Sequence, residues 1–201
     1  MKLFFSPTSP YVRKCLAVAT ELGLADRIRL LPSQASPVAA DASIAEHNPL
    51  GKVPTLITDD GQVIYDSRVI CEYLDALGAG GLFPAGAARW PALTQQALGD
   101  GLLDACLLAR YEDVLRPEAL RWPDWREGQL DKVRRALQVL EAAAPQLGGL
   151  AHIGSLSIGC ALWYVDLRFA ELAWRARHPK LAAWQAVFGQ RPSMQAEWAL
   201  N

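Results

Sequence analysis

Two short segments of this chain carry groups suited to holding an extended, charged ligand. In the first, Val53 precedes Pro54 at the start of an apolar run. Proline has no N–H for a sheet ladder and keeps the preceding residue extended, so the N–H and C=O of Val53 can face outward and pair with a ligand. In the second, Asp66 and Ser67 open an amphipathic helical pattern, where a carboxylate, a hydroxyl and free N–H groups can hold charged groups.

A third segment offers a hydroxyl at the start of the first predicted helix. Pro10 suits the first helical position, and Ser9 suits the cap before it. A hydroxyl and a helix N-terminus both favour a nearby anion. Local sequence alone favours Ser9 as a simple helix cap, and Ser6, at the end of the first predicted strand, is a rival hydroxyl.

The elements that must position these groups alternate between strand and helix over the first 77 residues. The strand–helix–strand opening predicts a parallel pair joined by a crossover. Asp59, Asp60 and Gly61 predict a hairpin turn. The patterns predict strands over 2–5, 27–31, 55–58 and 62–65, and helices over 10–22, 40–47 and 67–77.

A glycine-rich segment over residues 78–87 separates this region from one with helical patterns only. We therefore expect two domains, an α/β domain over 1–77 in the order βαβ-α-ββα and an all-helical domain over 88–201. The segment 78–87 is the expected linker. The patterns of the second region predict helices over 88–115, 125–143, 155–171 and 179–189.

Composition narrows the class of protein. A chain of 201 residues, 51% of them hydrophobic, can bury a core without a disulfide or metal. Its formal net charge of −1 argues against a general attraction to nucleic acid. No apolar run reaches the roughly 20 residues needed to span a bilayer, and the N-terminus is typical of a strand rather than a signal peptide. We expect a cytoplasmic protein that binds neither nucleic acid nor membrane.

The four cysteines predict neither a metal site nor a dithiol redox site. They lie far apart without a Cys-x-x-Cys pair, and the three histidines are equally scattered. Their helical, mostly apolar surroundings predict buried core thiols, of which Cys15 is nearest the candidate site. The cysteines are Cys15, Cys71, Cys106 and Cys160.

The run from Asn48 to Leu56, followed by Asp66 and Ser67, resembles the thioredoxin-like domain of the glutathione S-transferases. The run from Ser9 to Arg13, Ser-Pro-Tyr-Val-Arg, is similar to the serine motif of the tau class, and chain length together with the surrounding residues is similar to small bacterial transferase-like proteins. The resemblance covers essentially the whole chain. It implies a thioredoxin-like α/β domain followed by an all-α helical bundle, and a homodimer that uses glutathione as co-substrate in detoxification, without a metal.

The resemblance also implies a role for each candidate residue. Ser9 would donate a hydrogen bond to the glutathione thiol and favour its thiolate. Ser6 is the alternative, because Ser6 and Pro7 resemble the Cys-Pro opening of omega-class and glutaredoxin sites. Pro54 would follow a cis peptide bond, and Val53 would pair with the cysteinyl part of glutathione.

The two charged ends of glutathione have implied partners too. Lys52 would meet the glycine carboxylate, Asp66 the α-amino group, and Ser67 the α-carboxylate of the γ-glutamyl end. The second substrate, a small hydrophobic electrophile, would lie between the domains, with Tyr111 and Trp163 as candidate walls.

Two other functions remain open, and one departure from the family bears on the fold. The alternatives are a non-catalytic glutathione-binding or regulatory protein and a glutathione-dependent reductase or peroxidase. The reductase or peroxidase would need a thiol for disulfide exchange, and the two candidate positions hold Ser6 and Ser9 instead.

The departure from the family is in a capping box, usually Ser/Thr-x-x-Asp, whose positions here hold His152 and Ser155. We expect a cap weaker by about 1 kcal/mol, or one made another way.

Overall fold

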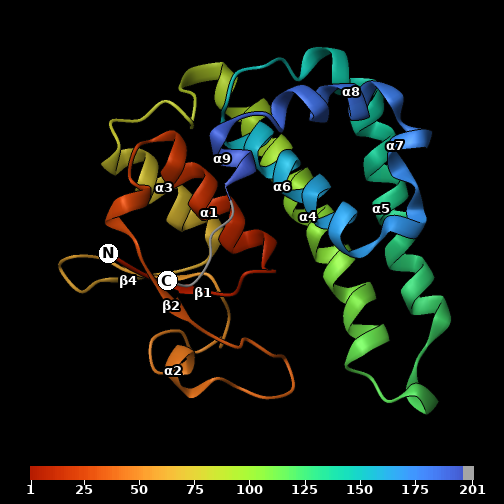
Figure 1. Cartoon of the computed structure of the whole chain (residues 1–201), viewed down its shortest axis with the longest axis horizontal. Coiled ribbons are helices and arrows are strands. Elements are labelled where there is room, and N and C mark those ends of the chain that lie inside the picture. The colour runs from red at the N-terminus through yellow and green to blue at the C-terminus, as the bar shows by residue number, and fades with distance from the viewer. Residues whose placement is uncertain (197–201) are drawn as a thin grey trace.

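A four-stranded sheet organises the N-terminal half of the computed structural model, which describes residues 1–196 (Figure 1). The strand order is β2-β1-β3-β4. The predicted parallel pairing of β1 and β2 is confirmed, with Leu3 opposite Leu30, whereas β3 runs antiparallel to both β1 and β4. The strands are β1 (Lys2–Phe5), β2 (Arg29–Pro32), β3 (Thr55–Ile57) and β4 (Val63–Ile64).

Helices α1 (Pro10–Glu21) and α3 (Ser67–Leu77) pack side by side, and their apolar side chains share a core with those of β1 and β3. Helix α1 is buried almost all around from Pro10 to Ala19. The reason is that α1 also contacts two helices of the C-terminal half, α6 and α9. Between β2 and β3 the helix predicted over 40–47 is only the short α2 (Ala42–Ala45).

The C-terminal half is helical throughout its described part, as predicted. A 3-10 turn over Gly86–Ala88 leads into the long helix α4, which crosses α6 closely. At the crossing, a Cβ on Gly99 would lie 2.9 Å from the backbone carbonyl carbon of Ser157, so only glycine fits. The helices are α4 (Arg89–Val114), α5 (Pro123–Ala143), α6 (Ile153–Arg168), α7 (Trp174–Arg177), α8 (Pro179–Phe188) and α9 (Pro192–Gln195).

The last described helix returns to the N-terminal half (Figure 1). Arg191, just before α9, forms a two-pronged ion pair with Glu21 at the end of α1, with N···O distances of 2.8 and 2.7 Å. The expected linker, residues 78–87, runs between α3 and α4, and we propose it as the boundary between the two domains.

The unusual cap of α6 is intact rather than weak. Nδ1 of His152 accepts hydrogen bonds from the N–H groups of Gly154 and Ser155, at 3.1 and 3.4 Å, and Oγ of Ser155 accepts one from the N–H of His152 at 2.9 Å. Burial lowers the pKa of His152, which favours the neutral ring that can accept at Nδ1. The helix starts at Ile153, two residues before the predicted position, because histidine replaces the usual hydroxyl in this reciprocal cap.

None of the helices within residues 1–196 combines the length and the apolar character needed to cross a membrane.

Candidate functional site

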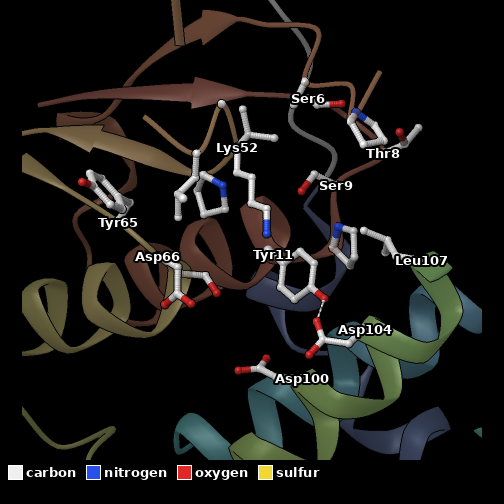
Figure 2. A pocket seen from close by; sticks show the side chains of 18 of the residues that line it. Ser6, Thr8, Ser9, Tyr11, Lys52, Tyr65, Asp66, Asp100, Asp104 and Leu107 are labelled. Carbon is white, nitrogen blue, oxygen red and sulfur yellow. Dashed lines mark hydrogen bonds between the residues drawn. The ribbon is translucent and has the colours of Figure 1, made fainter. Parts of the chain in front are cut away.

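A cleft of about 720 Å³ lies between the sheet-containing half and helix α4. Its walls come from the β1–α1 loop, the loop before β3, the start of α3, and the facing sides of α4 and α6. Figure 2 shows Ser9, Lys52 and Asp66 arranged around this space. The cleft brings together every residue that the sequence nominates for glutathione binding or activation, namely Ser6, Ser9, Lys52, Val53, Pro54, Asp66 and Ser67.

Ser9 occupies the N-cap of α1 with an extended backbone. Its Oγ accepts a hydrogen bond from the N–H of Val12 at 3.3 Å. Within residues 1–196 the Ser9 hydroxyl donates to no protein group, so its proton is available to a ligand in the cleft. Thr8 and Ser6 also line the cleft, and Thr8 is a third hydroxyl that the sequence does not single out.

The loop before β3 presents a free edge of backbone. The Val53–Pro54 peptide bond is cis, as predicted. Among residues 1–196 the N–H and C=O of Val53 form no hydrogen bond. Buried Asn48 holds the loop, because its Nδ2 donates to Lys52 O at 3.3 Å and to Thr55 Oγ1 at 2.9 Å. The loop can therefore pair with an extended ligand without first breaking a bond of its own.

The start of α3 lies opposite this edge and carries the acidic–serine pair. Asp66 is the N-cap, and its Oδ1 accepts the N–H of Arg68 at 2.9 Å. Ser67 is buried at the first position of the helix, whereas Asp66 and Lys52 are exposed. The N-terminus of the eleven-residue helix α3 lies here, with backbone N–H groups that have no partner within the helix and with the positive end of the helix dipole. This end of the cleft suits a carboxylate beside an amino group.

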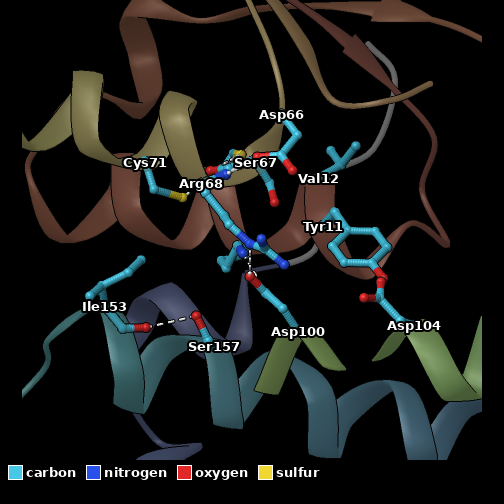
Figure 3. A network of polar contacts seen from close by, with 12 residues as sticks. Tyr11, Val12, Asp66, Ser67, Arg68, Cys71, Asp100, Asp104, Ile153 and Ser157 are labelled. Atoms are coloured by element: carbon cyan, nitrogen blue, oxygen red, sulfur yellow. Dashed lines mark hydrogen bonds and ion pairs between the residues drawn. The ribbon is translucent and has the colours of Figure 1, made fainter. Parts of the chain in front are cut away.

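A buried ionic cluster supports the start of α3 from below (Figure 3). The carboxylate of Asp100 on α4 lies 2.6 Å from Nζ of Lys14 on α1 and 3.0 Å from Nε of Arg68 on α3. The side chains of Lys14 and Asp100 are 0% and 1% exposed. Burial lowers the pKa of Lys14, but the charge and hydrogen bond of Asp100 outweigh burial and raise it, so Lys14 stays charged. Three helices therefore meet at one ionic contact.

A second polar contact spans the cleft. The hydroxyl of Tyr11, on the first turn of α1, donates a hydrogen bond to Oδ1 of Asp104 on α4, as Figure 2 shows. Burial, together with this carboxylate, raises the pKa of Tyr11 well above its ordinary value. Tyr11 is therefore a neutral donor that ties the cap of α1 to the helical half.

The other nominated residues have mixed outcomes. Tyr111 lines the cleft, as expected, and Trp163 does not. The Trp163 ring instead stacks beneath the Arg13 guanidinium, whose carbon is 4.3 Å from the ring centroid. Trp163 was a wrong candidate because its position on α6 faces α1 rather than the opening.

The cysteines are buried, as predicted. The sulfur of Cys15 is 3.9 Å from that of Cys71, and burial raises the pKa of Cys15 well above its ordinary value. Cys15 is outside the cleft lining and is held as an inert thiol. Within residues 1–196 no group of three or more His, Cys, Asp or Glu side chains could hold a metal ion.

Sequence reasoning missed the groups that support the site, including Lys14, Asp100 and Asp104. Asp100 lies one helical turn from Gln96 on α4, and both are buried. Polar residues one turn apart on the inner face of a helix were the available signal. That signal does not identify Lys14 as the partner, which requires the fold.

Comparison with known proteins places both halves of the chain in one family. Residues 8–77 match the description "Glutathione S-transferase, N-terminal domain", and residues 123–184 match "Glutathione S-transferase, C-terminal domain". The uncharacterized GST-like protein YibF of Escherichia coli (strain K12) is 35% identical over 191 residues, which is 90% of each chain.

Two crystal structures from Pseudomonas fluorescens Pf-5 are similar over nearly the whole chain. One glutathione transferase family member, with bound glutathione, is 51% identical with a TM-score of 0.94, covering 98% of this chain and 97% of that one. The other structure is of the same target with bound S-(propanoic acid)-glutathione, and it is 49% identical with a TM-score of 0.90, covering 98% of both chains.

Proposed function

Because this chain belongs to the glutathione S-transferase family, we propose that it is a serine-type transferase that activates the glutathione thiol for attack on a small electrophile. The observation that carries the proposal is the convergence on one cleft of a free hydroxyl at Ser9, an unpaired backbone edge at Val53 and the start of α3 at Ser67. These are the groups that a short, charged, thiol-containing peptide needs.

In this proposal glutathione lies extended along the loop before β3. The backbone of Val53 pairs with its cysteinyl residue beside the cis Pro54. Ser67 and the free N–H groups of α3 bind the γ-glutamyl carboxylate, Asp66 binds the α-amino group, and Lys52 binds the glycine carboxylate. The bound glutathione in the Pseudomonas fluorescens family member supports glutathione as the ligand.

The chemical step depends on forming the thiolate. A thiol with a pKa near 8.5 is only about 3% ionised at pH 7. A charge-assisted hydrogen bond from Ser9 contributes about 1.5–3 kcal/mol, and the N-terminus of α1 about 0.3–1 kcal/mol. At about 1.4 kcal/mol per pKa unit, these groups lower the thiol pKa by roughly one to three units. The proton leaves to solvent, so no general base is required.

We further propose that the electrophile enters between the domains, beside Tyr111, and that the protein works as a cytoplasmic homodimer in detoxification. The conjugate S-(propanoic acid)-glutathione, bound in a family member that is 49% identical, supports a cleft with room for a group on the sulfur.

The test compares three hydroxyl variants, Ser9→Ala, Ser6→Ala and Thr8→Val, with wild type. Initial rates of conjugation to 1-chloro-2,4-dinitrobenzene are measured from pH 5.5 to 9, and glutathione affinity is measured by calorimetry. We expect Ser9→Ala to lower kcat/KM at pH 6.5 by about tenfold or more and to raise the apparent thiol pKa by about one unit, while glutathione affinity changes less than threefold.

Ser6→Ala and Thr8→Val serve as matched controls and should keep the wild-type pH profile. A silent Ser9→Ala together with an impaired Ser6→Ala would transfer the role to Ser6. Glutathione binding without turnover of any electrophile would favour a binding or regulatory protein instead.

A further inference from the structure

Beyond the glutathione-binding groups, the cleft contains a cation with no counterion in the described structure. Arg110, on α4, lines the cleft and is half-buried. Within residues 1–196 its guanidinium forms no ion pair or hydrogen bond. Its guanidinium therefore offers five N–H donors to an anion that enters the cleft.

The acidic groups of the cleft do not supply that anion, because each already has a donor. Asp66 accepts from the N–H of Arg68, and Asp104 accepts from Tyr11. Asp100 is shared between Lys14 and Arg68. The remaining cation of the lining, Lys52, lies beside Val53 in the loop before β3 and belongs to the proposed glutathione subsite. Arg110 is thus a positive charge on a different element of the cleft wall, helix α4.

Two phenol groups lie beside this charge. Tyr111 and Tyr164 line the same part of the cleft, and the nearby Arg110 charge acts on both of them. Tyr164 is only 4% exposed, yet its hydroxyl has no hydrogen-bond partner among residues 1–196. Burial raises the pKa of both tyrosines, so their hydroxyls stay protonated and can donate. The Tyr164 hydroxyl lines the cleft and can therefore donate a hydrogen bond to a ligand atom there.

We propose that Arg110, with Tyr111 and Tyr164, forms an anion subsite that selects electrophiles carrying a carboxylate. The inference rests on the proposed transferase function and adds the substrate class to it. A guanidinium fork matches the two oxygens of a carboxylate, and two phenols supply further donors. Leu107 and Leu108, which also line the cleft, give the carbon skeleton an apolar surface.

A matched pair of electrophiles tests the subsite in turnover. With 4-chloro-3-nitrobenzoate, the glutathione thiolate attacks the chlorine-bearing carbon, a C–S bond forms, and chloride leaves with the electrons of the broken C–Cl bond. The neutral 4-chloro-3-nitrobenzamide reacts in the same way without the carboxylate. We expect Arg110→Gln to lower kcat/KM for the benzoate by roughly 10- to 100-fold and to change the benzamide value less than threefold.

Two further variants control for charge and folding. Arg29→Gln removes one positive charge from an exposed position on β2, outside the cleft lining, and should leave the activity toward both substrates unchanged. Arg110→Lys keeps the charge but loses the fork, so it should retain part of the preference for the benzoate. The proposal is overturned if Arg110→Gln loses activity toward both substrates, or if it keeps wild-type activity toward both.

Binding of S-conjugates separates the subsite from the catalytic function. S-(4-carboxybenzyl)glutathione and S-benzylglutathione are compared by calorimetry with wild type and Arg110→Gln. We expect wild type to bind the carboxylate form about tenfold more tightly and the variant to lose that difference. If the difference appears without turnover, the transferase function fails and the subsite stands. If turnover appears without the difference, the subsite fails. Binding of neither conjugate overturns both.

Discussion

The ionic cluster under α3 gives a prediction with a magnitude set by its burial. Nζ of Lys14 and Oδ1 of Asp100 are 2.6 Å apart, with both side chains almost fully buried. Asp100→Asn keeps the size of the side chain but leaves the Lys14 charge uncompensated. Removing one partner of a buried pair typically costs about 3–5 kcal/mol of unfolding free energy. In a chain of this size we expect Tm to fall by about 6–20 °C.

An exposed pair of similar geometry provides the matched control. Arg134 and Asp131 on α5 are 2.5 Å apart, but their side chains are 40% and 53% exposed. Water already solvates both charges, so Asp131→Asn should cost about 0–1 kcal/mol. The two variants make the same chemical change at nearly the same distance but differ in burial, and Arg134 keeps Glu127 as a second partner.

Urea unfolding followed by circular dichroism measures both variants at pH 7. The double variant Lys14→Met with Asp100→Leu should recover much of the loss, because it removes the buried charge and Arg68 is exposed enough to reach water. A loss below 1 kcal/mol in Asp100→Asn, equal to that of Asp131→Asn, would refute the reasoning. So would a double variant less stable than Asp100→Asn.

Two other predictions concern the fit of the helices and the clasp on α1. Gly99→Ala should lower the free energy of unfolding by about 1–3 kcal/mol, because its Cβ would meet the backbone of α6. Gly101→Ala, whose Cβ would have nothing within 4 Å, should raise it by about 0.5–1 kcal/mol. Urea unfolding that gave both changes the same sign would contradict this prediction. Hydrogen bonds from Arg191 hold the pKa of Glu21 below its ordinary 4.5. The extra stability of wild type relative to Glu21→Gln should therefore be fully present above pH 4.5 and should decline as pH falls through the folded-state pKa. An equal difference in unfolding free energy between the two proteins at about pH 6 and at about pH 3.5 would exclude that linkage.

The sequence predicts the local elements of this fold well because their signals are short-range. Pro10 after Ser9, and the helical pattern after Asp66, identify two helix starts that the structure places at Pro10 and Ser67. The parallel pairing of β1 and β2 follows from the crossover between them. The cap made by His152 could not be predicted, because histidine accepts at a helix start only when its ring is neutral and oriented.

The groups that support the cleft depend on contacts distant in sequence. Lys14 meets Asp100 across 86 residues, and Tyr11 meets Asp104 across 93. Helical periodicity shows which side of one helix is apolar, but it carries no information on which helix lies opposite. Trp163 illustrates the limit, since its position on α6 is compatible with either the opening or the contact with Arg13 that the fold selects.

Helix α1 belongs at once to the core beneath the sheet and to the packing of α6 and α9. A hinge motion between the two halves would have to separate α1, and the Ser9 hydroxyl at its N-terminus, from one of these two sets of neighbours. Rigid-body opening is therefore a poor route for such a molecule to accept bulkier partners. New substrate specificities should arise instead from side-chain substitutions along the outer turns of α4, because these leave the packing of α1 unchanged.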